Sequence, residues 1–213
     1  MNVLAWLRGR LRREDPPLAE ARWVVVDCET SGLDLQADRV LSIGAVRMEG
    51  GRIVVGDAFS VLLRQKEEST PGNIVIHGIG GEAQRGGVAP AEALADFERH
   101  AGDAVLVGFH AHFDRTMLER AMREHRGEAW RRRWIDLAQL LPALFPSRAR
   151  ACKALDDWLR ALEIGVEDRH EALADAVATA QLFQVALAEA TRQGVTGTRG
   201  LLRLAADARW AGG

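Results

Sequence analysis

Two acidic residues separated by one position, Asp27 and Glu29, follow the apolar run of residues 23–26. Side chains alternate between the two faces of a strand, so we expect both carboxylates on one face and Cys28 on the other. Two carboxylates in a partly apolar setting repel each other unless a cation lies between them. Taken alone, the pair is slightly better explained as two solvated acids at the end of a strand, and a cation site is the alternative.

Two further acids occur where helices are expected to begin. Asp114 follows the apolar run of residues 104–108, and taken alone it is best explained as the N-cap of the next helix. Asp175 lies among alanines and a valine, where a buried acid needs a cation or a hydrogen-bond donor. His170 precedes it by five residues, about 140° around a helix, and reaches the same site only from the helix start. Taken alone, His170 is an ordinary helix-start or surface histidine.

Considered together, these residues form an ordered set of four acids and one histidine spread over most of the chain. A cluster of carboxylate oxygens suits Mg²⁺ or Mn²⁺ rather than Zn²⁺. The set consists of Asp27, Glu29, Asp114, His170 and Asp175.

This set resembles the DnaQ-like 3′–5′ exonucleases of the DEDDh type, a family that includes proofreading subunits of DNA polymerases. Their first motif, Asp-x-Glu-Thr-Thr-Gly-Leu, is similar to residues 27–33, which read Asp-Cys-Glu-Thr-Ser-Gly-Leu. Residues 38–46 resemble the family's second strand, residues 76–79 read Ile-His-Gly-Ile, and residues 170–176 resemble its last motif. The resemblance covers roughly residues 22–190.

The second family motif, His-Asn-Ala-x-Phe-Asp, shows the clearest departure. Residues 109–114 read Phe-His-Ala-His-Phe-Asp, so His110 stands at the asparagine position. This difference leaves open a competing interpretation, a nucleic-acid-binding module of the same fold without turnover.

The resemblance implies an α/β protein with an RNase H-like fold, a mixed five-stranded sheet with helices on both faces. It implies hydrolysis of phosphodiester bonds at the 3′ end of single-stranded or frayed nucleic acid, with two Mg²⁺ or Mn²⁺ ions. DNA is favoured, RNA stays open, and a DNA polymerase is a candidate partner. Asp27, Glu29, Asp114 and Asp175 would be metal ligands and His170 the general base. Substrate contacts are implied for Thr30, Leu33, His77, His110 and Phe113.

The elements that must position these residues follow from hydrophobic periodicity. Strands are expected at residues 23–26, 40–48, 52–63, 104–108 and 134–136, with a glycine hairpin turn at 49–51. Helices are expected at residues 90–100, 115–125, 137–144, 153–162 and 171–192. Residues 67–87 are polar and glycine-rich, which predicts a loop. A meander of three strands followed by alternating helices and strands predicts a mixed α/β sheet.

The two ends of the chain are predicted to lie outside this domain. Residues 1–20 are interpreted as an N-terminal arm, residues 21–193 as the exonuclease domain and residues 194–213 as a weakly patterned C-terminal tail. The arm contains a short amphipathic helix within residues 3–11, which docks on the domain or binds a partner or a membrane surface. The arginines of residues 115–133 either follow a single-stranded backbone or form a solvated helix face.

Composition narrows the class of protein. The chain has 213 residues, with 28 Lys and Arg against 30 Asp and Glu, which excludes a histone-like protein that binds nucleic acid by net charge alone. The two cysteines form no zinc-ligand pattern, and neither a structural zinc site nor a disulfide framework is expected. No signal peptide and no membrane-spanning run are expected, so the predicted location is the cytoplasm.

Overall fold

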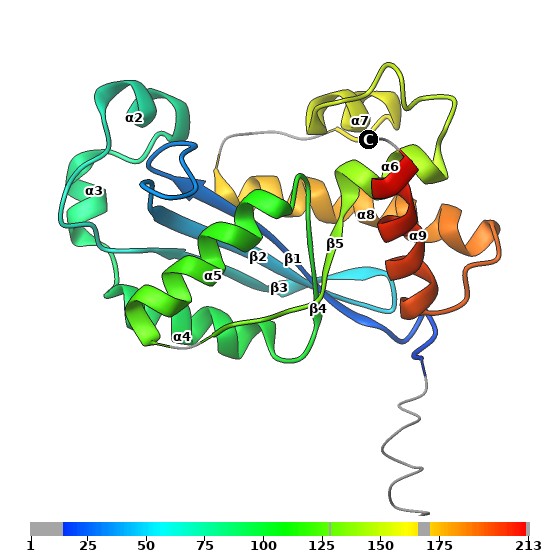
Figure 1. The fold of residues 1–213 in the computed structure, drawn as a ribbon, viewed down its shortest axis with the longest axis horizontal. Coiled ribbons are helices and arrows are strands. Elements are labelled where there is room, and N and C mark those ends of the chain that lie inside the picture. The colour runs from blue at the N-terminus through cyan, green and yellow to red at the C-terminus, as the bar shows by residue number, and fades with distance from the viewer. Residues whose placement is uncertain (1–14, 128, 166–170, 212–213) are drawn as a thin grey trace, which may run out of the picture.

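The computed structural model describes residues 15–127, 129–165 and 171–211. Its centre is one sheet of five strands in the order β3-β2-β1-β4-β5 (Figure 1). Strands β1 (Arg22–Thr30), β2 (Val40–Glu49) and β3 (Arg52–Leu62) form an antiparallel meander. Strands β4 (Val105–Gly108) and β5 (Trp134–Asp136) extend the sheet in parallel with β1. The mixed five-stranded sheet predicted from the sequence is confirmed.

Two hydrophobic cores lie on opposite faces of this sheet. The first core contains α6 (Leu137–Leu144), α7 (Leu155–Ala161) and α8 (Ala172–Arg192), and the second contains α4 (Pro90–Ala101) and α5 (His112–Arg126). Strand β1 alternates between them, because residues 23 and 25 enter the first core whereas 24, 26 and 28 enter the second. Residues 27 and 29 continue the register of the first face, as the sequence pattern predicted.

The prediction of a loop over residues 67–87 is wrong. This segment contains two short helices, α2 (Pro71–His77) and α3 (Gly81–Gly86). Thr70 caps α2 by accepting a hydrogen bond from the Asn73 N–H, Pro71 occupies its first turn, and Gly78 ends it in the left-handed conformation with φ of 69°. The glycines therefore mark helix ends, which a count of polar residues does not distinguish from a loop.

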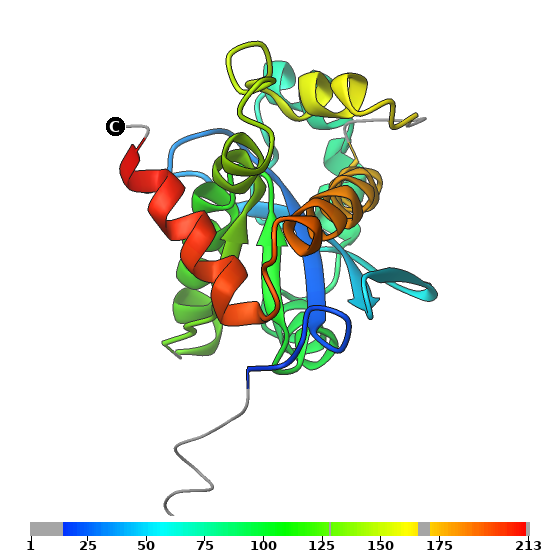
Figure 2. The ribbon, with the colours of Figure 1, turned by 90° about the vertical axis from the view of Figure 1, so that its right-hand side faces the viewer.

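The expectation of an unpatterned tail is wrong for most of residues 194–213, which form α9 (Thr198–Ala211). Leu201 and Ala205 are buried in the first core, where α9 packs beside α6 (Figure 2). The end of the N-terminal arm is tied to the same region, because the Leu18 N–H donates to the Thr196 carbonyl over 3.3 Å. The amphipathic helix expected within residues 3–11 lies outside the described residues.

None of the helices in the described part of the chain combines the length and the apolar character that crossing a bilayer would require.

Candidate active site

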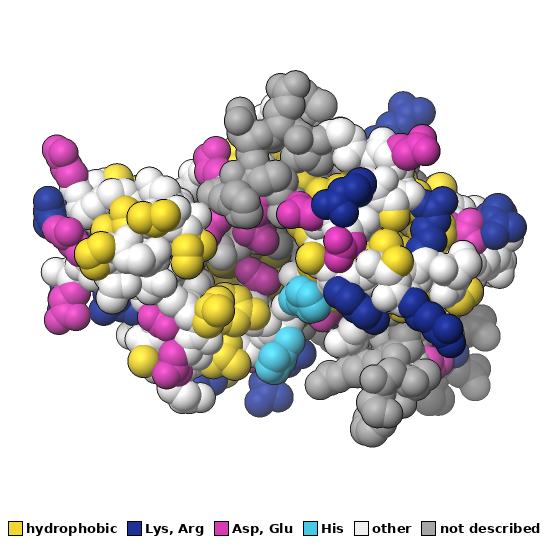
Figure 3. All heavy atoms as spheres, turned by 90° about the horizontal axis from the view of Figure 1, so that it is seen from above, with side chains coloured by type: hydrophobic (Ala, Val, Ile, Leu, Met, Phe, Trp, Pro, Cys, Tyr) yellow, Lys and Arg dark blue, Asp and Glu magenta, His cyan; other side chains and the backbone are white. Residues whose placement is uncertain are grey.

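Three of the predicted acids meet at one end of the sheet. Carboxylate oxygens of Asp27, Glu29 and Asp175 all lie within 4.8 Å of one another. Asp175 is buried, and Asp27 and Glu29 are partly exposed. Figure 3 shows acidic side chains gathered in a hollow of this face, with histidine side chains at its edge. Acids 148 positions apart in the sequence (residues 27 and 175) thus share one site.

A glycine in β2 lets α8 approach closely enough to complete this group. Gly44 pairs with Asp27 across the β1–β2 ladder. A Cβ atom at Gly44 would lie 2.2 Å from backbone atoms of Ala172 and Leu173, which open α8. The helix start therefore rests directly on the backbone of the sheet, and Asp175 follows one turn later. The positive end of the α8 dipole also lies beside the three carboxylates.

Asp114 reaches the site from the opposite face of the sheet. It lies in the first turn of α5 rather than at its N-cap, which is Ala111, so the capping interpretation is wrong. Its Oδ1 accepts the backbone N–H of Cys28 at 3.1 Å. The ladder between β1 and β4 ends at Val25, and Asp114 satisfies a β1 donor beyond that point. The buried carboxylate is thus fixed beside the residue that separates Asp27 from Glu29.

Burial and mutual repulsion disfavour the charged forms of these acids. Burial, followed by the charges of Asp175 and Glu171, raises the pKa of Glu29 to about 7. Burial also raises the pKa of Asp114 to about 7, although the backbone hydrogen bonds that this carboxylate accepts act to lower the pKa. Desolvation and like charges both act in this direction, and a cation placed among the acids would reverse it.

A fifth acid at this edge, Asp136, escaped the sequence interpretation. It ends β5 and caps α6 by accepting the Ala138 N–H at 3.0 Å. Burial raises the pKa of Asp136, and its charge in turn raises the pKa of Asp114. The available signal was its position, because the carboxyl ends of neighbouring parallel strands meet at one edge of a sheet.

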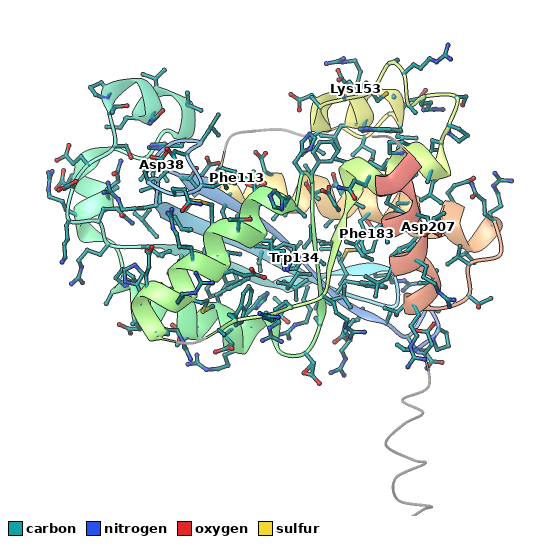
Figure 4. All side chains as sticks on the ribbon, in the orientation of Figure 1. Asp38, Phe113, Trp134, Lys153, Phe183 and Asp207 are labelled. Carbon is teal, nitrogen blue, oxygen red and sulfur yellow. The ribbon has the colours of Figure 1, made fainter. Side chains whose placement is uncertain are left out.

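The loop after β1 is held rigid by one carboxylate, that of Asp38. Its Oδ1 accepts the Ser31 hydroxyl at 2.7 Å, and its Oδ2 accepts the Asp34 N–H at 2.8 Å. A Cβ at Gly32 would lie 2.4 Å from the same carboxylate, so any larger residue there would displace the Asp38 side chain from these hydrogen bonds. Leu33 projects from this loop with 85% of its surface exposed. Figure 4 shows Asp38 at the same upper edge of the sheet as Phe113.

Helix α2 lies against this loop, since the Asn73 side-chain amide donates to the Ser31 carbonyl. His77 at the end of α2 is 5% exposed, and its Nδ1 accepts the Ile79 N–H at 3.0 Å. The neutral ring therefore carries its proton on Nε2, which is buried without a hydrogen-bond partner in the described residues. Such a donor is costly to leave unsatisfied in the folded protein.

The remaining predicted substrate residues differ in their surroundings. Thr30 ends β1, and its hydroxyl donates to the Gly32 carbonyl at 2.7 Å. Phe113 is partly buried and packs against the second core. His110 is exposed with φ of 55°, a left-handed conformation that asparagine adopts more readily than most residues. The predicted general base, His170, lies outside the described residues.

The chemistry of the donor set fits a divalent cation. An octahedral Mg²⁺ ion with oxygens at about 2.1 Å places adjacent ligand oxygens about 3 Å apart and opposite ones about 4.2 Å apart. The three carboxylates of Asp27, Glu29 and Asp175 have oxygens within 4.8 Å of one another, which matches this range after small side-chain movements. Asp114 is not part of this three-residue group.

An open mixed sheet with helices on both faces and carboxylates at the end of its central strand defines an RNase H-like α/β domain. The chain belongs to the RNase T exonuclease family, whose family model, described as "Exonuclease", matches residues 24–183. The resemblance to DnaQ-like exonucleases is thereby confirmed.

Two curated relatives illustrate the similarity. The DNA polymerase III PolC-type of Thermotoga maritima is 34% identical over 170 residues, which are 80% of this chain and 12% of that protein. A DNA polymerase III subunit epsilon-like protein of Rhodobacter capsulatus is 33% identical over 194 residues, 88% of this chain and 27% of that protein. This chain therefore spans only a small part of the length of these relatives.

Solved structures of Exonuclease I from E. coli show the same fold. The complex with a dT13 oligonucleotide has a TM-score of 0.71 at 18% identity, over 82% of this chain and 42% of that one. The zinc-bound complex with single-stranded DNA has a TM-score of 0.70 at 20% identity, over 82% of this chain and 41% of that one.

Proposed function

We propose that this chain is a divalent-metal-dependent exonuclease that removes nucleotides from the 3′ end of single-stranded or frayed nucleic acid, with DNA favoured. The observation that carries the proposal is the gathering of Asp27, Glu29 and Asp175 within 4.8 Å at one hollow. Family membership supports the reaction class. The oligonucleotide bound by Exonuclease I and the polymerase names of the relatives support DNA as the substrate and a polymerase as a partner.

Each acid has a separate role in this proposal. Asp27, Glu29 and Asp175 would hold one Mg²⁺ or Mn²⁺ ion, and Asp27 and Asp114 would hold a second. When bound, such a pair of ions stabilises the charge on the attacking and leaving oxygens of an in-line displacement at phosphorus. The hydrogen bond from Cys28 keeps the Asp114 carboxylate in place, so this ligand is ordered before any ion binds.

The proton of the attacking water would be taken by His170. An unperturbed imidazole has a pKa of about 6.5, which suits a base that works near neutral pH. Leu33, at the exposed tip of its loop, would contact the terminal base together with Thr30 and the buried Nε2–H donor of His77. His110 would lie beside the substrate at the edge of the hollow, and Phe113 would support the site by packing beneath it.

The test is nucleotide release from 5′-labelled strands of DNA and RNA with Mg²⁺ or Mn²⁺. The proposal predicts a ladder that shortens from the 3′ end, nucleoside 5′-monophosphates as products, and protection by a blocked 3′ terminus. Asp27→Ala should release nothing at the same protein concentration. An active Asp27→Ala variant would contradict the site, and protection by a blocked 5′ terminus would contradict the polarity.

A binding module without turnover is distinguished in the same experiment. In that case neither the wild type nor Asp27→Ala would release nucleotides under any metal, although both would bind the strand. Faster degradation of RNA than of DNA would change the preferred substrate and leave the site and its chemistry in place.

A further inference from the structure

The end of the sheet opposite the carboxylates is lined by arginines. Strands β1, β4 and β5 begin there, and the described part of the chain also begins at this end (Figure 2). A hollow of about 580 Å³ opens beside Ala104, and a second of about 440 Å³ shares Asp103, Ala104 and Arg133 with it. We call this surface the arginine pole, after the side chains that line the two hollows: Arg22, Arg47, Arg131, Arg132, Arg133 and Arg199.

Several of these arginines already have acidic partners. Arg22 lies 3.5 Å from Glu49, and Arg47 lies 2.5 Å from Asp57. Such ion pairs offset the positive charge locally, and they leave little of it for a ligand.

Arg131 and Arg133 differ from these neighbours. Both are exposed, and neither has an ion-pair partner within residues 15–127, 129–165 and 171–211. Arg132 between them is fixed, because its guanidinium lies 5.4 Å from the centre of the Trp130 ring and donates to the Gly102 carbonyl. The segment before β5 is therefore anchored at its middle residue and presents two unpaired cations to the larger hollow.

Acidic side chains share the two hollows with these arginines, namely Asp15, Glu20, Glu49 and Asp103. Glu49 is paired with Arg22, and the Asp15 carboxylate accepts the backbone N–H of Arg199.

We propose that the arginine pole binds the phosphodiester backbone of the substrate strand, away from its reacting end, and this inference rests on the proposed function. Guanidinium groups match phosphate oxygens in charge and in bidentate geometry. A protein partner would instead need apolar or aromatic anchors. The large apolar side chains exposed in the described residues are Leu33, Val75 and Ile76, which lie on the β1 loop and α2 at the other end of the molecule.

The separation of the two sites sets a minimum length for the strand. From Arg22 to Glu29, β1 rises about 3.3 Å per residue, or roughly 23 Å in total. A stacked strand advances about 3.4 Å per nucleotide and would span this distance with about seven nucleotides, and an unstacked strand needs fewer. A strand of 20 nucleotides is therefore long enough to reach both ends.

The experiment compares the full chain with the double variant Arg131→Gln/Arg133→Gln. Binding of a fluorescent 20-nucleotide DNA strand is measured by anisotropy in EDTA from 0.05 to 1 M NaCl. Loss of two phosphate contacts should lower the slope of log K against log salt by about 1.4, which is a roughly 25-fold loss of affinity at 0.1 M that vanishes near 1 M. The control is Arg148→Gln/Arg150→Gln, an equal charge loss at two exposed arginines outside the pole that have no ion-pair partner in the described residues.

The outcomes separate this inference from the proposed function. If the wild type hydrolyses DNA but the two double variants bind the 20-nucleotide strand with the same slope, the arginine pole is overturned. If the predicted slope change occurs while no metal supports hydrolysis, the pole stands and the exonuclease proposal fails. A labelled poly-glutamate peptide that binds more tightly than DNA, and only with Arg131 and Arg133 intact, would overturn the choice of nucleic acid in favour of an acidic protein partner.

Discussion

The two ends of the sheet carry charge in opposite ways. At the carboxyl ends of β1, β4 and β5, acids from both faces are buried or half-buried, and their pKa values are raised. At the amino ends of the same strands, the arginines are mostly exposed and several are paired. Burial makes the acidic end costly without a cation, whereas solvent screens the basic end. This contrast is what the proposed function predicts, because the acidic end needs a cation whereas the arginines carry charge at little cost to the fold.

The largest expected effect comes from removing one acid of the three-residue group. Asp175→Asn keeps the volume and removes a charge, so nucleotide release should fall by about a thousandfold or more. The metal-free protein should be at least as stable as the wild type, because a repulsive charge is gone. The matched control is Asp207→Asn on the exposed face of α9, which should change neither quantity. A variant that unfolds would make Asp175 structural and would erase the contrast between the two ends.

The second prediction concerns the close contact between Gly44 and the start of α8, which brings Asp175 to the acidic end of the sheet. Gly44→Ala places a methyl group where the backbone of Ala172 and Leu173 now lies, so α8 must shift outward. We expect a loss of about 1 to 3 kcal/mol in the free energy of unfolding, together with a loss of activity through a displaced Asp175. Chemical denaturation measures the first and nucleotide release the second. Gly72→Ala, with open space around its added methyl group inside α2, should leave activity unchanged and should not lower the free energy of unfolding.

The third prediction concerns how the stability of the protein depends on pH and on bound metal. With a folded pKa of about 7 against an ordinary 4.5, Glu29 binds more protons in the folded than in the unfolded state. Stability of the metal-free protein should therefore fall as pH rises through the range 4.5 to 7. A bound cation favours the ionised carboxylates, so added Mn²⁺ should raise the melting temperature by several degrees at pH 8 and by much less at pH 5.5.

Glu29→Gln should flatten this pH dependence of the metal-free melting temperature. The melting temperature is measured against pH once with EDTA and once with Mn²⁺. If the difference between the two melting temperatures stayed constant from pH 5.5 to 8, the account would be contradicted.

The smallest expected effect lies at the basic end. Arg131→Gln/Arg133→Gln removes two exposed, unpaired charges, so its free energy of unfolding should differ from the wild type by about 0.5 kcal/mol or less. Urea denaturation at low and high salt measures this difference. A loss as large as that expected for Gly44→Ala would show that the arginines are structural and would weaken the contrast drawn above.

Much of the fold was predictable because its periodicity is strong. The helices from α4 to α8 were expected within a few residues of their observed bounds, since residues such as Phe183 and Leu187 mark buried faces. The strands were also expected, although β1 runs beyond residues 23–26 to Thr30. Helices α2 and α3 were missed because they have six or seven residues and glycine at their ends. Helix α9 was missed because its burial depends on a partner, α6, far away in the sequence.

The candidate site was predictable in part. Period two placed Asp27 and Glu29 on one face, and the last family motif singled out Asp175. Local sequence favoured a cap for Asp114, because its bond to Cys28 joins residues that are 86 positions apart. For the same reason Gly44 carried no visible signal, and Asp136 offered only its position at the end of β5. Their roles depend on which strands are neighbours, and that is a property of the folded sheet rather than of a segment.

The most direct test of the central claim is the location of bound metal in a crystal of the full chain grown with Mn²⁺. The account predicts an anomalous difference peak coordinated by oxygens of Asp27, Glu29 and Asp175, and its absence in Asp175→Asn crystals. Ordered manganese bound elsewhere, with these three carboxylates turned away from one another, would contradict it.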